Sequence, residues 1–315
     1  MPNSLVLLCL VFGSSLASSL FFVLSARVLR GAAGGDAPNA IGVVGVTHVG
    51  AALFLLPFLP AAGIVSPTDF KTMASASVLI LILLTAVLHF TARLFHFKAL
   101  SLTDVSLVSP FAALTPVLTL FTAWIIIGER PSALEFTGIL IVVVSLLGLT
   151  GATQVIRAYI SSRSGITGEG SKNLGLWFAF LSTVPPAVKI AVQKKAILLS
   201  SPFAYALIML FLTGACALLI CVFRFRTVEL RAQFPGPRLR SLIFISGLLA
   251  LNTFLFCKAL TLGMAAGVSA MARISIVFQG VLAYWLAGQT SDFRKRILWA
   301  VAIFAGTLVI GFAGS

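Results

Sequence analysis

Charged residues are scarce in this chain, and acidic residues are the scarcest. Only 10% of the 315 residues are charged, and eight are Asp or Glu against 22 Lys or Arg. All eight acids fall in predicted loops or at predicted helix ends, which argues against proton coupling by a carboxylate buried in a membrane. The four cysteines show no metal-ligand spacing, so they indicate neither a disulfide framework nor a metal site.

Sequence patterns of enzymes are also missing. The chain contains no nucleophile–base constellation, no Gly-rich phosphate loop and no HExxH motif. We therefore expect no catalytic residues, no cofactor and no enzyme activity. The lack of a nucleotide-binding motif also argues against direct drive by ATP.

Apolar residues, in contrast, are abundant. They make up 59% of the chain, and the mean hydropathy is +1.11. This composition is typical of an integral membrane protein, whose partner is the lipid bilayer. The net charge of +14 does not predict a nucleic-acid partner, because basic residues of membrane proteins gather in short loops beside the bilayer.

Ten apolar runs are long enough for helices that cross a membrane. A hydrocarbon core of about 30 Å needs roughly 20 residues of helix, and the runs are too long for barrel strands. The first run lacks the basic residues that precede a secretory signal, so we interpret it as a span. The predicted fold is an all-α polytopic membrane protein with ten transmembrane helices. The predicted spans are residues 4–26, 40–62, 73–97, 104–127, 132–151, 173–195, 202–223, 239–260, 264–287 and 296–313.

The pentapeptide KALSL at residues 98–102 returns as KALTL at residues 258–262. A shift of 160 residues aligns 98–129 with 258–289 without a gap, and about ten of the 32 positions are identical. This similarity predicts an internal duplication. Because each unit has five spans, an odd number, the two repeats are expected to be inverted in the membrane. The predicted parts are a first repeat at 1–151, a connecting loop at 152–172 and a second repeat at 173–315.

Lys and Arg are distributed unequally between the two predicted sides of the membrane. Fifteen lie in or beside the loops that follow the odd-numbered spans, and five lie on the opposite side. The positive-inside rule places the larger set in the cytoplasm. We therefore expect a protein of the plasma (inner) membrane with both termini outside.

Residues 98–143 resemble the core of the EamA-like branch of the drug/metabolite transporter superfamily. The residues that carry the resemblance are a small-residue end of the third helix, Pro110 and Pro116 in the fourth helix, Gly128 and Glu129 at its exit, and Gly138 early in the fifth helix. The resemblance implies ten helices, inverted five-helix repeats and a central cavity for a small organic solute that is moved by alternating access. The superfamily is diverse in substrate, so membership does not identify the solute.

The second half departs from this pattern at three positions. Ile276 stands where the first half has Pro116, and Gln289 stands where it has Glu129. Arg273 replaces Ala113 near the middle of the predicted ninth helix. A charge at that depth costs several kcal/mol and usually faces a cavity, so Arg273 is the first candidate for substrate binding.

Lys189 in the sixth helix is the second buried cation. It follows Pro185 and Pro186, whose rings interrupt the hydrogen-bond ladder of the helix. Its long side chain could also reach an interface without any role in binding. Because no carboxylate is expected in a span, we predict that a carboxylate or phosphate of the substrate neutralises Arg273 and Lys189.

Five further residues complete the predicted site. Trp124 and Tyr284 occupy equivalent positions on the helix faces assigned to the cavity, and Asn252 could hydrogen-bond the substrate. His48 and His89 titrate near neutral pH and are candidates for proton coupling, although a lone His in a helix more often has a packing role. Helix breaks are predicted at Pro110, Pro116, Pro185 and Pro186.

The predicted function is secondary transport of a small organic metabolite that carries a carboxylate or phosphate. The alternative is a flippase for an anionic lipid-linked intermediate, which would use the same basic residues but open sideways to the bilayer. A third class, a membrane protein that binds partners but transports nothing, is disfavoured because it would not explain the duplicated spans or the buried Arg273. A homodimer is compatible with the sequence.

Overall fold

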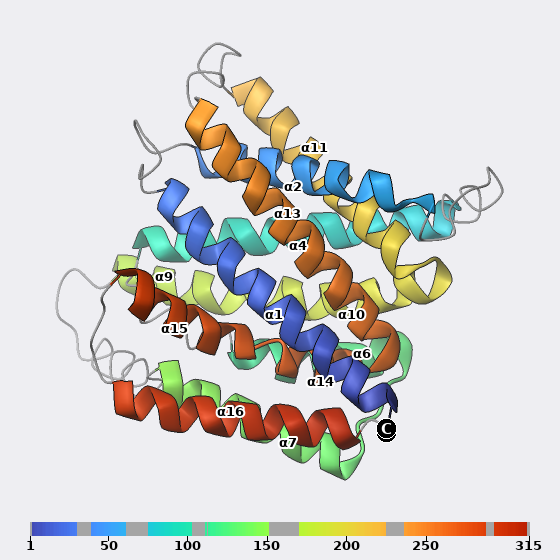
Figure 1. The fold of residues 1–315 in the computed structure, drawn as a ribbon, viewed down its shortest axis with the longest axis vertical. Helices are drawn as coiled ribbons and strands as arrows, with labels where there is room; N and C mark the ends of the chain where they lie inside the picture. Colours follow the sequence, from blue (N-terminus) through green and yellow to red (C-terminus); the bar gives the residue numbers. More distant parts are fainter. Residues whose placement is uncertain are drawn as a thin grey trace.

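The computed structural model consists of helices, and the residues that it describes contain no strand, which confirms the all-α prediction (Figure 1). The structure describes residues 2–29, 39–60, 75–102, 111, 113–150, 170–224, 236–287 and 293–313. The helices are α1 (Pro2–Leu29), α2 (Ala40–Leu55), the 3-10 turn η1 (Leu56–Phe58), α4 (Ala76–Leu102), α6 (Leu114–Ile127), α7 (Ala133–Thr150), α9 (Gly170–Leu181), α10 (Val184–Leu199), α11 (Pro202–Arg224), α13 (Gly236–Leu262), α14 (Ala265–Met271), α15 (Ile274–Ala287) and α16 (Phe293–Ala313).

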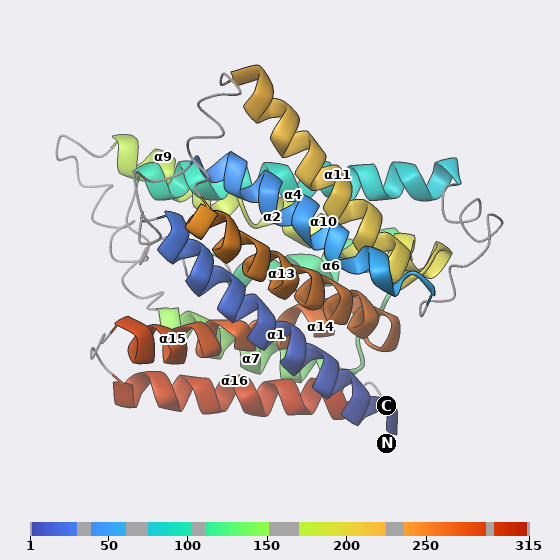
Figure 2. The ribbon, with the colours of Figure 1, turned by 45° about the horizontal axis from the view of Figure 1, so that its top comes forward.

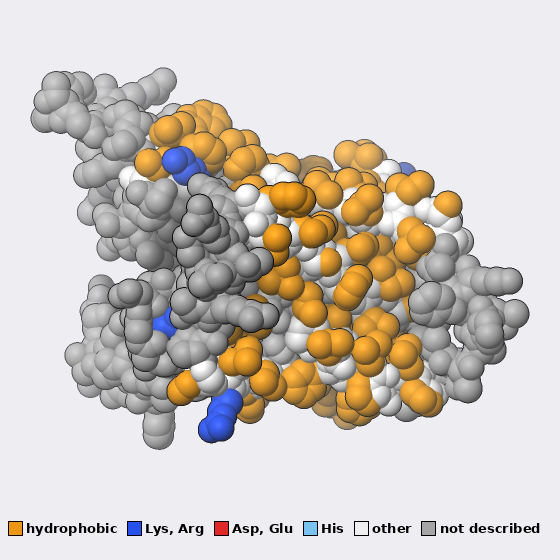
Figure 3. All heavy atoms as spheres, turned by 90° about the horizontal axis from the view of Figure 1, so that it is seen from above, with side chains coloured by type: hydrophobic (Ala, Val, Ile, Leu, Met, Phe, Trp, Pro, Cys, Tyr) orange, Lys and Arg blue, Asp and Glu red, His pale blue; other side chains and the backbone are white. Residues whose placement is uncertain are grey.

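Six helical segments in the described part of the chain are long and apolar enough to cross a membrane. They are Asn3–Ser25, Ile41–Phe58, Ala76–His96, Leu174–Leu199, Pro202–Phe223 and Gly236–Leu262. The four other predicted spans coincide with shorter apolar helices at Leu114–Ile127, Ala133–Leu149, Ala265–Gln279 and Leu298–Ala313. On the face drawn in Figure 3, hydrophobic side chains cover the middle and Lys or Arg side chains lie toward the margins. This is the surface of a multi-pass membrane protein, and the number of ten crossings stays a prediction.

The helices of the two halves correspond in length and in packing. Helices α4 and α13 begin and end 160 residues apart, and so do α6 and α15. Helix α1 packs against α13 and α15, just as α10 packs against α4 and α6. In Figures 1 and 2, α1, α4 and α7 run from right to left, whereas α13 and α16 run from left to right. This exchange of partners with opposite direction is the packing that an inverted duplication would produce.

Two helix pairs join corresponding elements of the two halves. Helix α2 packs along α11, and α7 packs along α16. The beginning of α1 and the end of α16 lie at the same corner of the molecule (Figure 2).

At the beginning of α7, Ser132 and Glu135 form a capping box. The Ser132 N–H donates to the Glu135 carboxylate over 2.8 Å, and the Glu135 N–H donates to the Ser132 hydroxyl over 3.2 Å.

The sixth predicted span is interrupted between α9 and α10, next to Pro185 and Pro186. Pro185 lies in the first turn of α10, where a missing N–H removes no bond within the helix. Pro116 lies in the first turn of α6, which begins at Leu114. Most of the predicted fourth span before α6 lies outside the described residues, so the break expected at Pro116 stays a prediction. Pro110 lies outside the described residues.

The close contact between α2 and α11 depends on glycine. A methyl group added at Gly214 would lie 2.6 Å from the backbone nitrogen of Val49 and 3.1 Å from the carbonyl oxygen of Gly45. Backbone atoms cannot move aside as side chains do, so we expect Gly214→Ala to lower the free energy of unfolding by about 1–3 kcal/mol. Thermal melting of the purified protein in detergent checks this. Gly247→Ala is the control, because its methyl group would meet only Phe54, at 3.6 Å.

Candidate functional site

Three of the predicted site residues lie together inside the bundle, on three different helices. The Lys189 Nζ atom on α10 lies 3.5 Å from His89 Nδ1 on α4. The rings of His89 and His48, which is on α2, have centroids 5.6 Å apart. His48 Nδ1 lies 2.8 Å from the Val44 carbonyl oxygen, which can only accept, so this nitrogen carries the hydrogen. We call Lys189, His89 and His48 the basic cluster.

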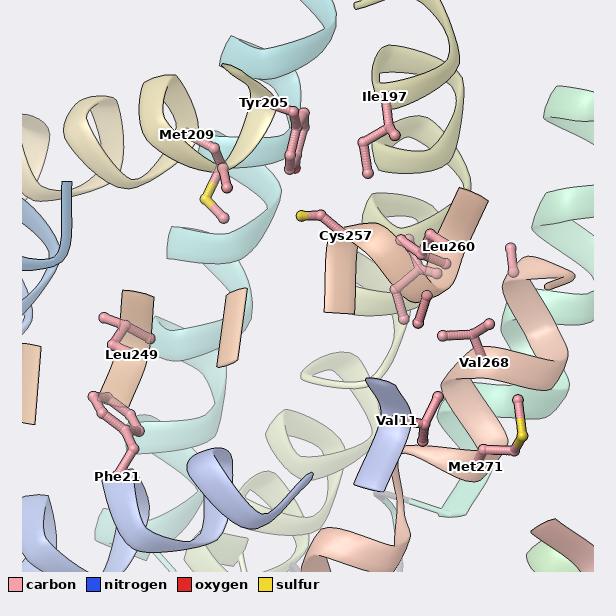
Figure 4. Packing of buried hydrophobic residues seen from close by; sticks show 14 of the residues in the cluster. Val11, Phe21, Ile197, Tyr205, Met209, Leu249, Cys257, Leu260, Val268 and Met271 are labelled. Atoms are coloured by element: carbon pink, nitrogen blue, oxygen red, sulfur yellow. The ribbon is translucent and has the colours of Figure 1, made fainter. Parts of the chain in front are cut away.

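A second group of buried polar side chains begins one helical turn after Lys189 on α10. Gln193, one turn after Lys189 on α10, is 1% exposed and donates to the Cys257 thiol over 3.3 Å. Tyr205 on α11 donates to the Thr85 hydroxyl on α4 over 2.9 Å. Figure 4 shows the Cys257 sulfur on the side of α13 that faces Tyr205. Helices of both halves therefore meet at polar side chains within an apolar core.

Arg273 lies at a second helix break, between α14 and α15, where no proline stands. Its own backbone makes 3-10 bonds: the Arg273 N–H donates to Ala270 over 3.0 Å, and its carbonyl accepts from Ile276 over 2.9 Å. The Arg273 Nε is buried and has no hydrogen-bond partner. No hydrogen bond or ion pair of the guanidinium is found within the described part of the chain. Arg273 is thus a charged group in the bundle without a protein counter-ion there.

Serines of α1 hold this break from the other half of the molecule. The Ser15 hydroxyl donates to the Ala272 carbonyl over 3.3 Å. The Ser19 hydroxyl lies 2.8 Å from the Ser275 carbonyl oxygen. The Ala272 carbonyl also accepts from the Ser275 N–H over 3.2 Å, so the Ser15 hydroxyl is a second donor to it. The Ser14 hydroxyl, beside Ser15, donates to Asn252 Oδ1 over 2.9 Å, so α1 also contacts the predicted residue on α13.

The structure does not bring Trp124 into either group. Its side chain is 51% exposed on α6, beside the exposed Phe121 and Ile125, whereas Ala113 and Pro116 earlier on the helix are buried. The same face of α6 therefore leaves the interior toward the end of the helix, and Trp124 is better placed for lipid contact than for a solute. The side chain of Tyr284, the other predicted aromatic, lies outside the described part of the structure.

Glu129 and Lys194 form an ion pair between the two halves at one end of the bundle. Glu129 follows α6, and its second carboxylate oxygen accepts the Ala265 N–H at the start of α14 over 2.8 Å. Lys194 on α10 donates to the Gly263 carbonyl over 2.7 Å. We call these contacts the Glu129 clamp. Sequence spacing does not reveal the pair, because Lys194 and Glu129 meet only once α6 and α10 pack together.

The two acids in the described ranges are both engaged away from the buried cations. Glu129 belongs to the clamp, and Glu135 caps α7 through Ser132. Neither carboxylate neutralises Arg273 or the basic cluster.

Comparison with known proteins gives a family and a fold. Residues 5–151 match the model of the EamA-like transporter family. A solved crystal structure, described only as that of a protein, aligns with a TM-score of 0.70 at 16% sequence identity, over 96% of this chain and 95% of that chain. At this identity the likeness shows a shared fold alone. None of the curated proteins matches the sequence.

Proposed function

Because the chain is a member of the drug/metabolite transporter superfamily, we propose that it is a secondary transporter of a small organic solute bearing a carboxylate or phosphate. The observation that carries the proposal is Arg273, whose buried Nε has no partner among the described residues. A guanidinium in a membrane interior is costly unless an anion neutralises it. The substrate would supply that anion, and Lys189 and Asn252 are the other residues proposed to contact it.

The Glu129 clamp supports alternating access as the proposed mechanism. It ties α6 of the first half to α10 and the α13–α14 turn of the second half. A transporter that opens at this end must break these contacts, and one that opens at the other end can keep them. We therefore propose that the clamp closes one end of the solute path.

The test of the proposed function is uptake into proteoliposomes with a panel of matched solutes. Each organic carboxylate or phosphate is paired with the amide or alcohol of the same size. We expect saturable uptake of at least one anion and none of its neutral partner. Uptake of neutral solutes alone would refute the proposal. Movement of an anionic lipid between leaflets, without uptake of any soluble anion, would favour the flippase instead.

We also propose the basic cluster as the group that takes up a coupling proton. The Lys189 Nζ atom lies 3.5 Å from His89 Nδ1, so the lysine and the imidazole can share one proton. Without the imidazole, we expect that a proton gradient no longer drives accumulation of the solute. We expect His89→Gln to lower accumulation driven by an imposed proton gradient severalfold, while exchange of solute without a gradient continues. Equal loss of both activities would instead indicate a structural role.

A further inference from the structure

Ser269 is one of three buried serines in the described helices whose hydroxyl has no hydrogen-bond partner, and the other two, Ser4 and Ser25, lie on α1. Ser269 lies on α14 and is 1% exposed. A buried Ser or Thr in a helix usually donates to a carbonyl three or four residues earlier. Among the described helices, six buried residues do so: Ser19 to Ser15, Thr47 to Val43, Thr85 to Ile82, Thr119 to Thr115, Ser246 to Leu242 and Thr307 to Ile303. The Ser269 hydroxyl therefore makes no hydrogen bond to the carbonyls of its own helix.

Ser269 stands one helical turn before Arg273. The helical bonding of α14 continues to Ala272, whose N–H donates to Val268 over 2.9 Å, and tightens to a 3-10 bond at Arg273, whose N–H donates to Ala270 over 3.0 Å. Side chains four residues apart in a helix are neighbours on one face, with Cβ atoms about 5–6 Å apart. Two polar groups without partners, the Ser269 hydroxyl and the Arg273 Nε–H, thus occur on adjacent turns. Both are hydrogen-bond donors.

Nearby acceptors that could satisfy Arg273 are already engaged. The Ala272 carbonyl accepts from Ser15, and the Ser275 carbonyl lies 2.8 Å from the Ser19 hydroxyl. The two described carboxylates, Glu129 and Glu135, bind elsewhere. The helix break therefore presents two hydrogen-bond donors, Ser269 and Arg273, and the positive charge of Arg273.

We propose that Ser269 and Arg273 form one anion-binding subsite, in which two oxygens of a carboxylate or phosphate monoester accept from the hydroxyl and from the guanidinium. This inference rests on the proposed function and adds to it a second residue of the site. The serines of α1 keep the break in the conformation that presents both donors. A neutral solute of the same shape lacks the charge that the guanidinium requires, so the subsite selects anions.

The experiment measures thermal stabilisation of the purified protein by small probes. Acetate is compared with acetamide, and glycerol phosphate with glycerol, with sodium chloride as the control for ionic strength. Binding to the native state raises the melting temperature in a saturable manner, which yields an apparent Kd. We expect the anions alone to stabilise the wild-type protein. Ser269→Ala should weaken their binding about ten- to 100-fold, the usual effect of one lost hydrogen bond to a charged group.

Two variants separate the possible failures. Ser4→Ala removes another buried hydroxyl without a partner, at the start of α1, and should leave the apparent Kd unchanged. If Arg273→Met abolishes anion binding and Ser269→Ala leaves the Kd at the wild-type value, the subsite proposal is overturned and the proposed function stands. If the anions stabilise no better than chloride, or if Arg273→Met binds them as the wild type does, both are overturned.

Discussion

Replacing Arg273 by Met should lower the uptake of anionic solutes by about 30-fold or more. The substitution keeps most of the side-chain volume and removes the charge that we propose as the partner of the substrate anion. Leaving one member of a buried charge pair without its partner typically costs about 2–5 kcal/mol, and each 1.4 kcal/mol is a factor of ten. The measurement is initial uptake into proteoliposomes at equal protein content. Arg273→Lys should retain part of the activity, because it keeps the charge but loses the planar fork of donors.

Folding must be separated from binding in this comparison. Removal of a buried charge that has no protein partner should not destabilise the empty protein, and relief of the desolvation cost can stabilise it. We therefore expect Arg273→Met to melt at or above the wild-type temperature. Arg240→Met makes the same change at an exposed position on α13 and should leave uptake unchanged. A melting temperature well below that of the wild type would assign Arg273 to the fold rather than to the solute.

Neutralising Glu129 should open the end of the bundle that we propose the clamp closes. Glu129→Gln removes the charge that pairs with Lys194 and keeps an oxygen for the Ala265 N–H. A loss of about 1 kcal/mol from the closed state shifts the equilibrium roughly fivefold toward the open state. The reporter is Ala123→Cys, since Ala123 is 1% exposed and lies just before the clamp on α6. In a background without the four native cysteines, we expect an impermeant thiol reagent to modify it about five times faster.

The adjacent basic residue gives a matched control for the clamp. Arg130 is exposed and takes no part in the contacts of the clamp, so Arg130→Gln should leave the modification rate unchanged. Lys194→Met should accelerate modification as Glu129→Gln does, and the double variant should add little to either. Unchanged rates in both single variants would show that the clamp stabilises the fold without closing a path.

Hydrophobic runs and the internal duplication make most of the fold predictable from the sequence. Runs of about 20 apolar residues can satisfy their backbone groups in a bilayer only as helices, so the elements follow from composition and length. The 160-residue repeat then indicates which helices correspond. The two cations were visible because charge is rare in such spans, and Arg273 was visible also because Ala113 occupies its twin position.

The contacts of the site were less accessible to sequence reasoning. No proline marks the helix break at Arg273 in the sequence. The serines of α1 that contact this break lie more than 250 residues away in the chain. The clamp joins Glu129 to a lysine on a helix of the other half, which depends on packing and not on spacing. Trp124 was placed in the interior on the assumption that one helix face keeps one environment along its length. The exposure of Trp124 shows that α6 emerges from the core before it ends.

The most direct test of the central claim is counterflow in proteoliposomes that contain the wild-type protein. Vesicles are loaded with an unlabelled organic anion, and entry of the same labelled anion is followed without any imposed gradient. If the protein carries anionic solutes by alternating access, internal anion will accelerate entry of the label, whereas the neutral partner of equal size will not. Entry at the same rate into loaded and empty vesicles, or equal acceleration by the neutral solute, would contradict the account.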